Sequence, residues 1–258
     1  MRFGVVTGSE TLAAARDIGF DFVEIPLARE VSPLLSRSER AAKSKLLADA
    51  PLPVEAGCVF FPAEMKVIGP DTNDSAVTEY VSAVLDRCSE LGMEIVVFGS
   101  GNSRNIPDGF PIEQAEDQVD ALLQMMGDEA QTRGMTVVIE PLNTGECNWI
   151  NSVEEAADIV ARIDHPNVKV LADLYHISVE KEGFHGMLGA GYDVEHVHVS
   201  SADRSPPRED GADWTSMFRA LKALGYDSRL SMECRWTDFE REAPDALAFL
   251  KRAWDEAF

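Results

Sequence analysis

Eight short apolar runs alternate with longer helix-like stretches along the whole chain. The runs are rich in Val, Ile and Leu, as buried strands are, and lie at Arg2–Val6, Phe22–Ile25, Val54–Cys58, Ile95–Phe98, Thr136–Glu140, Val168–Ala172, His196–Val199 and Arg229–Met232. Strands that alternate with helices form a parallel sheet with right-handed crossovers. The chain has 258 residues, and a complete eight-stranded β/α barrel has about 250. We therefore predict an α/β fold, a single (β/α)8 barrel.

The stretches between the runs carry apolar residues three to four positions apart, which is typical of amphipathic helices. The clearest cover Glu10–Ile18, Arg40–Leu47, Val77–Leu91, Ile112–Arg133, Val153–Ile163, Trp214–Leu224 and Pro244–Phe258. An open, doubly wound sheet is the rival arrangement, but no GxGxxG follows the first run, and GSGNSR after Phe98 is a poor substitute. Because no linker interrupts the pattern, we expect one domain over residues 1–258.

Charge and cysteine content limit the partners and the compartment. The formal net charge is −22, whereas nucleic acids and acidic membrane surfaces are bound through Lys and Arg. We therefore expect neither as a partner. The chain shows no signal-peptide pattern and no apolar run as long as a membrane span. The four cysteines (Cys58, Cys88, Cys147 and Cys234) form no CxxC pair, which predicts free thiols and a cytoplasmic location.

Four consecutive runs in the second half end with side chains that can bind a metal. These are Glu140 in VVIEPLN, Asp173 in VLADLYH, His198 in HVHVS and Glu233 in SMEC. In a β/α barrel the carboxyl ends of all strands open onto one face, where active sites lie. Structural pairing is the alternative, but three clustered carboxylates repel one another without a cation. The pattern therefore predicts one divalent-metal site.

The predicted ligand set indicates which metal it would hold. Three oxygen donors and one imidazole form a hard-to-borderline set. We expect Mn²⁺, with Mg²⁺ or Co²⁺ as alternatives, and the lack of thiolates argues against Zn²⁺.

These motifs, in this order, resemble the sugar isomerase/epimerase family of xylose-isomerase-like TIM barrels. The segments AARDIGFDFVEI, ELGMEIVVFGSG and DGADWTSMFRALKALGYDSRLSMEC extend the likeness over nearly the whole chain. Members of this family include ketose 3-epimerases and hydroxypyruvate isomerases. The resemblance implies a small-molecule sugar or sugar derivative as the substrate. The sequence does not give the oligomeric state, but relatives commonly form dimers or tetramers, so the resemblance is compatible with a homo-oligomer.

Three further residues match positions that assist catalysis in the epimerases. Glu146 lies six residues after Glu140, His176 three after Asp173, and Arg204 six after His198. The resemblance implies that His176 and Arg204 hold the substrate carbonyl oxygen and that Glu146 binds the terminal hydroxyl. Arg and His can donate to an oxygen that becomes negative in an enediolate. Structural roles stay open: a bond from His176 to Asp173, a surface pair of Arg204 with Asp203 or Glu209, and a solvated Glu146.

Two other polar residues belong to predicted strands. His196 shares the inward face of its strand with His198, one layer deeper, and we interpret it as a core histidine. Glu24 closes the second strand, where it would either support the site or form a structural salt bridge. The loops after the first strands, TGSETL, PLAREVSP and GSGNSR, contain no residue to which a role can be assigned.

The reaction that we expect is ketose 3-epimerisation through a cis-enediolate held on the metal, with Glu140 and Glu233 as acid and base. Proton return to the neighbouring carbon would give a hydroxypyruvate-type isomerase, and loss of a hydroxyl an inosose-type dehydratase. A DNA-repair endonuclease on this fold needs further histidines on the third and fourth strands, yet no histidine precedes His165. A non-catalytic sugar-binding barrel is the remaining alternative.

The loops after His198 and Glu233 bear on whether the substrate is phosphorylated. Both hold more acids than cations and lack the Gly-rich pattern of barrel phosphate sites. This favours a free sugar, although Arg104, Arg208 or Arg235 would be available to a phosphate.

Overall fold

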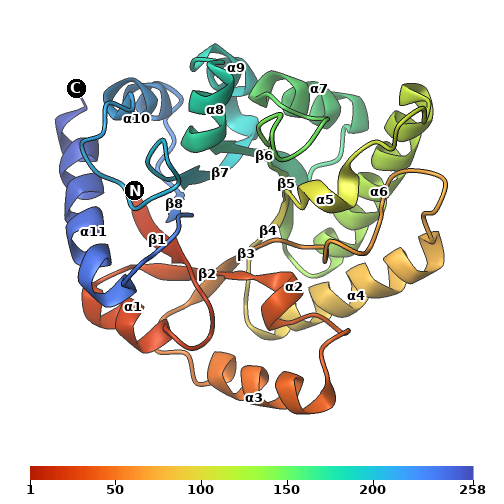
Figure 1. The fold of residues 1–258 in the computed structure, drawn as a ribbon, viewed down its shortest axis with the longest axis horizontal. Helices are drawn as coiled ribbons and strands as arrows, with labels where there is room; N and C mark the ends of the chain where they lie inside the picture. The colour runs from red at the N-terminus through yellow and green to blue at the C-terminus, as the bar shows by residue number, and fades with distance from the viewer. Residues whose placement is uncertain (258) are drawn as a thin grey trace.

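Eight parallel strands close into a barrel in the computed structural model, which describes residues 1–257 (Figure 1). The strands are β1 (Arg2–Val6), β2 (Phe22–Pro26), β3 (Val54–Cys58), β4 (Ile95–Phe98), β5 (Thr136–Ile139), β6 (Val168–Asp173), β7 (Val194–Val199) and β8 (Arg229–Met232). Each strand pairs with the next along the chain, and β8 pairs with β1 to close the ring. The predicted barrel is confirmed, and every predicted strand lies within two residues of an observed one.

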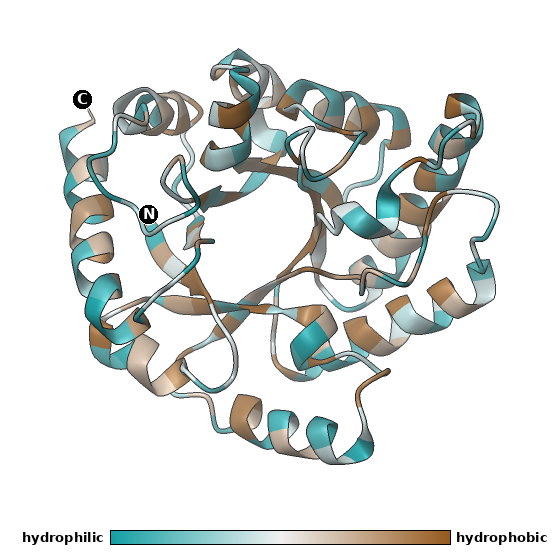
Figure 2. Cartoon of the chain, in the orientation of Figure 1, coloured by the Kyte–Doolittle hydropathy of each residue, from teal (hydrophilic) through white to brown (hydrophobic). Residues whose placement is uncertain are grey.

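Helices form an outer ring around the barrel (Figure 1). They are α1 (Leu12–Ile18), α2 (Leu27–Glu30), α3 (Arg37–Ala48), α4 (Asp74–Glu90), α5 (Gly101–Arg104), α6 (Ile112–Thr132), α7 (Val153–Ile163), α8 (Leu174–Glu180), α9 (His185–Ala190), the 3-10 turn η1 (Gly191–Asp193), α10 (Trp214–Ala223) and α11 (Phe239–Glu256). In Figure 2 the strands are mainly brown, whereas the helices carry both colours, as expected of amphipathic helices around a buried sheet.

Side-chain caps set several helix starts earlier than the apolar pattern predicts. The Ser36 hydroxyl accepts a hydrogen bond from the Glu39 backbone N–H, and the Glu39 carboxylate accepts one from the Ser36 backbone N–H, so α3 begins at Arg37. The predicted start of the last helix at Pro244 was wrong. Asp238 caps the helix at Phe239, and Pro244 lies inside it. The predicted end of this helix, Phe258, lies outside the described residues.

The inside of the barrel is divided into an apolar part and a polar part. Side chains from β3 to β6 form a small apolar cluster of Ala56, Cys58, Ile95, Val97, Val138 and Leu171. A polar group from β2 and β7 is equally buried and consists of Glu24, His196 and His198. The outward faces of the strands pack with the helices in a much larger apolar core. The polar group therefore lies where a barrel of this size ordinarily has apolar side chains.

An ion-pair network joins the amino-terminal ends of the strands. The Glu55 carboxylate accepts hydrogen bonds from Arg2 Nη1 at 2.6 Å and from Arg229 Nε at 2.7 Å. Arg229 also pairs with Glu94. In β/α barrels this end serves stability.

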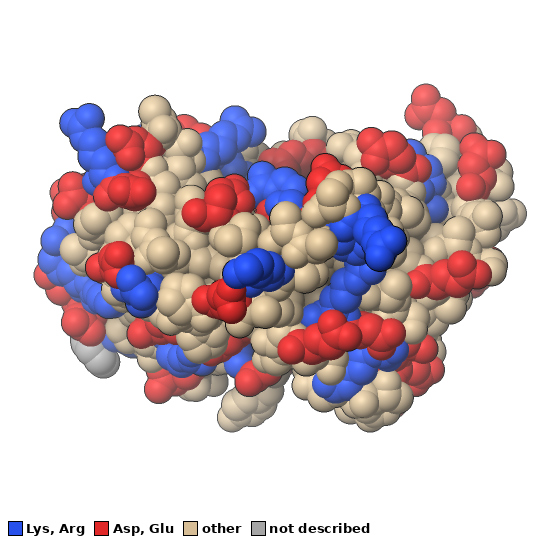
Figure 3. All heavy atoms as spheres, turned by 90° about the horizontal axis from the view of Figure 1, so that it is seen from below, with Lys and Arg blue, Asp and Glu red and all other residues tan. Residues whose placement is uncertain are grey.

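Surface and cysteine observations agree with the composition. Acidic and basic side chains are interspersed on the face shown in Figure 3. Over residues 1–257, no helix has both the length and the apolar character that crossing a bilayer requires. All four cysteines are free thiols, as predicted.

Candidate active site

The four predicted metal ligands converge at the carboxyl-terminal mouth of the barrel. Glu140 directly follows β5, Asp173 ends β6, His198 is the penultimate residue of β7, and Glu233 directly follows β8. One ligand atom from each lies within 4.8 Å of the ligand atoms of the other three. His198 Nδ1 is 3.3 Å from Glu140 Oε1 and 3.6 Å from Glu233 Oε2. This spacing leaves one point that all four side chains can reach.

The electrostatics of this cluster show a need for positive charge. Burial, reinforced by the charge of Glu233, raises the pKa of Glu140, and burial raises the pKa of Asp173 to about 6. Burial opposes ionisation of Glu233 too, but hydrogen bonding to His198 and the charge of Arg204 hold its pKa at about 2. Carboxylates with raised pKa values are those that a nearby cation would stabilise.

One oxygen of Asp173 lacks a partner that would balance its negative charge. Its Oδ1 accepts a hydrogen bond from the Tyr175 backbone N–H at 2.7 Å, as the cap of α8. Its Oδ2 is buried and finds no hydrogen-bond donor among the described residues. Such an orphaned acceptor is rare in folded proteins. Together with the imidazole and the two glutamates, it fits a divalent cation that prefers oxygen ligands.

Arg204 is central to the contacts beside this cluster. Its Nη1 donates to Glu233 Oε2 at 2.7 Å, and its Nη2 lies 3.3 Å from Glu146 Oε2. Its guanidinium also covers the Tyr175 ring, 4.4 Å from the ring centre. The residue has a left-handed backbone with φ of 62°, a strained conformation for a non-glycine residue that often marks functional sites. Arg204 thus faces the site, and Asp203 pairs with Arg208 instead.

Hydrogen-bond donors face both ring nitrogens of His176. The backbone N–H of Asn143 donates to His176 Nδ1 at 2.9 Å. The Arg204 guanidinium, which can only donate, has its Nη2 3.0 Å from His176 Nε2, and burial lowers the pKa of His176. Nε2 also lies 3.7 Å from Asp173 Oδ2 and 4.0 Å from Glu140 Oε1. His176 therefore lies beside the cluster, with Nε2 beyond hydrogen-bond distance of both carboxylates.

Glu24 crosses the barrel interior from β2 to β7. Its Oε2 is 2.8 Å from His196 Nε2, and its Oε1 is 3.0 Å from His198 Nε2. All three side chains are fully buried. His196 is the core histidine that we predicted, although its Nδ1 has no partner in the described part of the chain.

Two cavities meet at Glu146, Arg204 and Glu233. The larger, about 860 Å³, is bounded by loops after β1, β2 and β8 and is lined among others by Thr7, Glu10, Arg29, Arg235 and Trp236. The smaller, about 200 Å³, is lined among others by Phe61, Ser100, Asn102, Glu140 and Leu142. The loops after β1, β2 and β4 contain no residue whose role could be predicted from the sequence. Their only sequence signal is that each directly follows a strand end.

The arginines considered for a phosphate have different environments. Arg104 is fully buried and donates to the backbone carbonyls of Phe98 and Glu140, so it supports the strand ends. Arg208 is half-exposed and paired with Asp203. Arg235 alone of the three lines the larger cavity.

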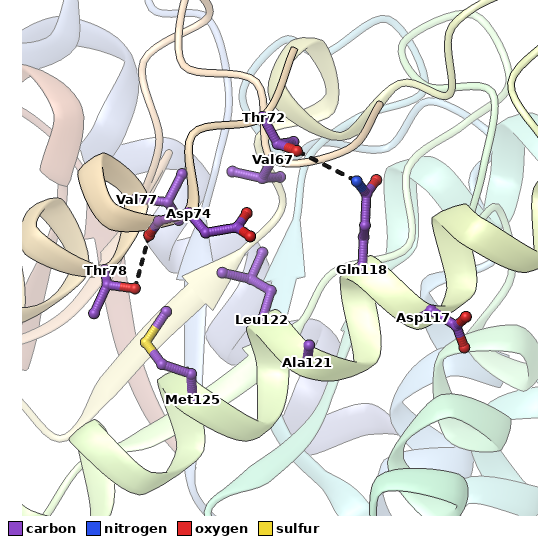
Figure 4. A pocket seen from close by; sticks show the side chains of 10 residues that line it. All are labelled: Val67, Thr72, Asp74, Val77, Thr78, Asp117, Gln118, Ala121, Leu122 and Met125. Carbon is purple, nitrogen blue, oxygen red and sulfur yellow. Dashed lines mark hydrogen bonds between the residues drawn. The ribbon is translucent and has the colours of Figure 1, made fainter. Parts of the chain in front are cut away.

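A further cavity of about 320 Å³ lies outside the barrel between α4 and α6 (Figure 4). Gln118 spans it and donates to the carbonyl of Gly69 and to Thr72 Oγ1. Val77, Leu122 and Met125 supply its apolar wall (Figure 4). It contains none of the predicted site residues, so the chemistry is concentrated at the barrel mouth.

Comparison with known proteins finds relatives of this chain. A D-psicose 3-epimerase from Ruminiclostridium cellulolyticum is 32% identical over 105 residues, which cover 40% of this chain and 36% of that protein. A ketose 3-epimerase from Arthrobacter globiformis is 25% identical over 222 residues, 84% of this chain and 74% of that protein. The first three curated relatives are matched over only 36% to 54% of their own lengths.

The same fold is found among solved structures. The structure of D-psicose 3-epimerase with D-tagatose from Clostridium cellulolyticum H10 superposes with a TM-score of 0.84 at 21% identity, over 98% of this chain and 99% of that one. The family described as "Xylose isomerase-like TIM barrel" matches residues 12–253. This chain therefore belongs to the xylose isomerase-like TIM barrel family.

Proposed function

We propose that this chain is a divalent-metal-dependent ketose 3-epimerase acting on a free sugar or sugar derivative. The observation that carries the proposal is the convergence of Glu140, Asp173, His198 and Glu233 around one point, with the orphaned Asp173 oxygen among them. Relatives named as ketose 3-epimerases support the reaction class. A single domain, a cytoplasmic location, a homo-oligomer and the lack of nucleic-acid or membrane partners stay predictions from the sequence.

The four ligands would hold Mn²⁺, or alternatively Mg²⁺ or Co²⁺. When bound, the ion supplies Lewis-acid polarisation of the substrate carbonyl and a template for its oxygens.

Glu140 and Glu233 are the proposed acid and base. They follow β5 and β8, which are separated by β6 and β7 in the ring, so they extend toward the centre from different sides. Epimerisation requires removal of the C3 proton from one face and delivery of a proton to the other face, through a cis-enediolate. One glutamate performs each proton transfer. The two carboxyls already differ in acidity in the metal-free chain, as acid and base pairs often do.

Arg204 and His176 would stabilise the charge that develops on the substrate oxygen. The Arg204 guanidinium lies 3.0 Å from His176 Nε2, so both groups are on the same side of the cluster. Donors aimed at a developing oxyanion contribute strongly in a site that excludes water. Glu146, whose side chain is 41% exposed at the rim, would accept a hydrogen bond from a terminal hydroxyl.

The experiment is turnover of a panel of free and phosphorylated ketoses with added Mn²⁺ in D₂O, read by NMR. Deuterium at C3 in an epimerised product is the expected result. Incorporation at C1 or C2 would instead identify an aldose–ketose isomerase, and loss of water a dehydratase. No exchange with any sugar, in a protein that binds Mn²⁺, would refute the substrate class.

A further inference from the structure

Glu24 is a fully buried carboxylate whose two oxygens are both engaged by histidines of one strand. It lies on β2, whereas His196 and His198 lie on β7, which is separated from β2 by β8 and β1 in the ring. The carboxylate contacts the Nε2 atoms of both rings, at 2.8 Å and 3.0 Å. The bridge therefore passes through the barrel interior directly beneath the four-residue cluster.

This bridge determines which nitrogen His198 presents to the cluster. A carboxylate only accepts hydrogen bonds, so the hydrogen between His198 and Glu24 is on Nε2. The opposite nitrogen, Nδ1, faces the oxygens of Glu140 and Glu233. A histidine that donates one N–H to a carboxylate has its tautomer and ring orientation fixed, and its other nitrogen becomes a better metal ligand.

His196 has a different part in the arrangement. Its Nε2 holds the second oxygen of Glu24, and its ring lies edge-on to that of His198 with the centres 5.0 Å apart. It belongs to no carboxylate cluster other than that of Glu24 among residues 1–257. Apart from this ring contact with His198, His196 is connected to the site through Glu24.

Stability alone gives a poor account of this bridge. Burying an ion pair in place of well-packed apolar side chains is often neutral or destabilising. The same interior accepts apolar side chains on the β3 to β6 side, and backbone pairing already joins β7 to the rest of the ring. We propose that Glu24 is a positioning residue that holds His198 with Nδ1 directed at the metal site. The inference rests on the proposed metal-dependent function.

The test compares two variants of the same bridge: Glu24→Ala removes its central carboxylate, and His196→Ala removes only the histidine that is not a proposed metal ligand. The full chain is freed of metal with EDTA and titrated with Mn²⁺ by calorimetry, and the Tm of each metal-free protein is recorded. Both variants are expected to lower the Tm, since both open a buried cavity. Only Glu24→Ala is expected to weaken Mn²⁺ binding, by about 10- to 100-fold. His196→Ala should stay within about threefold of the original chain, because the contact between Glu24 and His198 remains.

If the bridge is purely structural, both substitutions will lower the Tm and leave the Mn²⁺ affinity unchanged. That result would overturn this inference but not the proposed metal site. No Mn²⁺ binding by the original chain would overturn both this inference and the proposed metal site.

A second measurement needs no Glu24 variant and so holds even if Glu24→Ala does not fold. The chain is labelled with ¹⁵N in its imidazoles and loaded with Zn²⁺ as a diamagnetic probe, and the His198 signals are assigned through His198→Asn. The expected spectrum shows a hydrogen retained on Nε2 and a Zn²⁺-dependent shift at Nδ1. A hydrogen on Nδ1, or a shift at Nε2 in its place, would overturn the inference.

Discussion

Replacement of Gly99 by alanine should damage the site without damaging the fold. Gly99 follows β4, and a Cβ built on it would lie 2.0 Å from Glu140 Oε2. Contacts below 3.0 Å are essentially never seen for real Cβ atoms, so the Glu140 carboxylate would have to withdraw by about 1 Å. Gly99 is not among the residues with positive φ, so its backbone accepts alanine. The free energy of unfolding should therefore change by less than about 1 kcal/mol.

A displacement of this size is large for a catalytic group. Misplacement by about 1 Å can lower turnover about 100-fold. For Mn²⁺ we expect a tenfold weaker Kd, which corresponds to about 1.4 kcal/mol. Both quantities follow from the position of one carboxylate, and they are measured by Mn²⁺ calorimetry and by the C3-exchange assay.

Gly186→Ala is the matched control. A Cβ there would lie 2.3 Å from Glu182 Oε1, so it also displaces a glutamate, but one that binds the Val153 backbone N–H on the outside of the barrel. Mn²⁺ affinity should not change in this variant. If Gly99→Ala retains both the affinity and the turnover of the original chain, the assigned position of Glu140 in the site is refuted.

Three further changes test separate parts of the structure. Glu233→Gln keeps an oxygen ligand but cannot transfer a proton, so turnover should fall by about 100-fold or more while calorimetry still shows Mn²⁺ binding; near-normal activity would contradict its role. Because burial raises the pKa of Asp173 to about 6, the folded metal-free chain holds this proton more tightly than the unfolded chain. The free energy of unfolding of the original chain, relative to that of the Asp173→Asn variant, should therefore fall by up to about 3 kcal/mol from pH 4 to pH 7, measured by denaturation in EDTA; a difference that does not change with pH would contradict the raised pKa. Glu55→Ala leaves Arg2 without its carboxylate partner and Arg229 with Glu94 alone, and it should cost about 2 kcal/mol, with the Mn²⁺ Kd unchanged; a weaker Kd would show coupling between the two ends.

The strands were predictable because each is buried on both faces. A run such as Ile95–Phe98 is apolar at every position and fully buried, so its pattern is independent of the rest of the fold. The short helices α2, α5, α8 and α9 were missed. Each has four to seven residues, too few to show an amphipathic repeat. Their positions depend on the strand ends that they follow.

The site was predictable only where topology places residues automatically. Any side chain at the end of a barrel strand faces the mouth, so four such positions suffice to predict a cluster. The contact between Glu24 and His198 joins residues 174 positions apart, and no periodicity encodes it. It depends on the register of strands around the ring, including the shift between Val23 and Glu24 where β2 pairs with β3.

Acidic side chains have different numbers of cationic partners at the two ends of the barrel. At the amino end, Glu55 is held between two arginines. At the mouth, three carboxylates of the cluster have only Arg204 and His198 as cationic partners, and one oxygen of Asp173 has none in the described chain. In a sequence selected for stability alone, further Lys or Arg residues would neutralise these carboxylates, as the arginines beside Glu55 do at the amino end of the barrel. The negative charge left at the mouth is what the proposed divalent cation would neutralise.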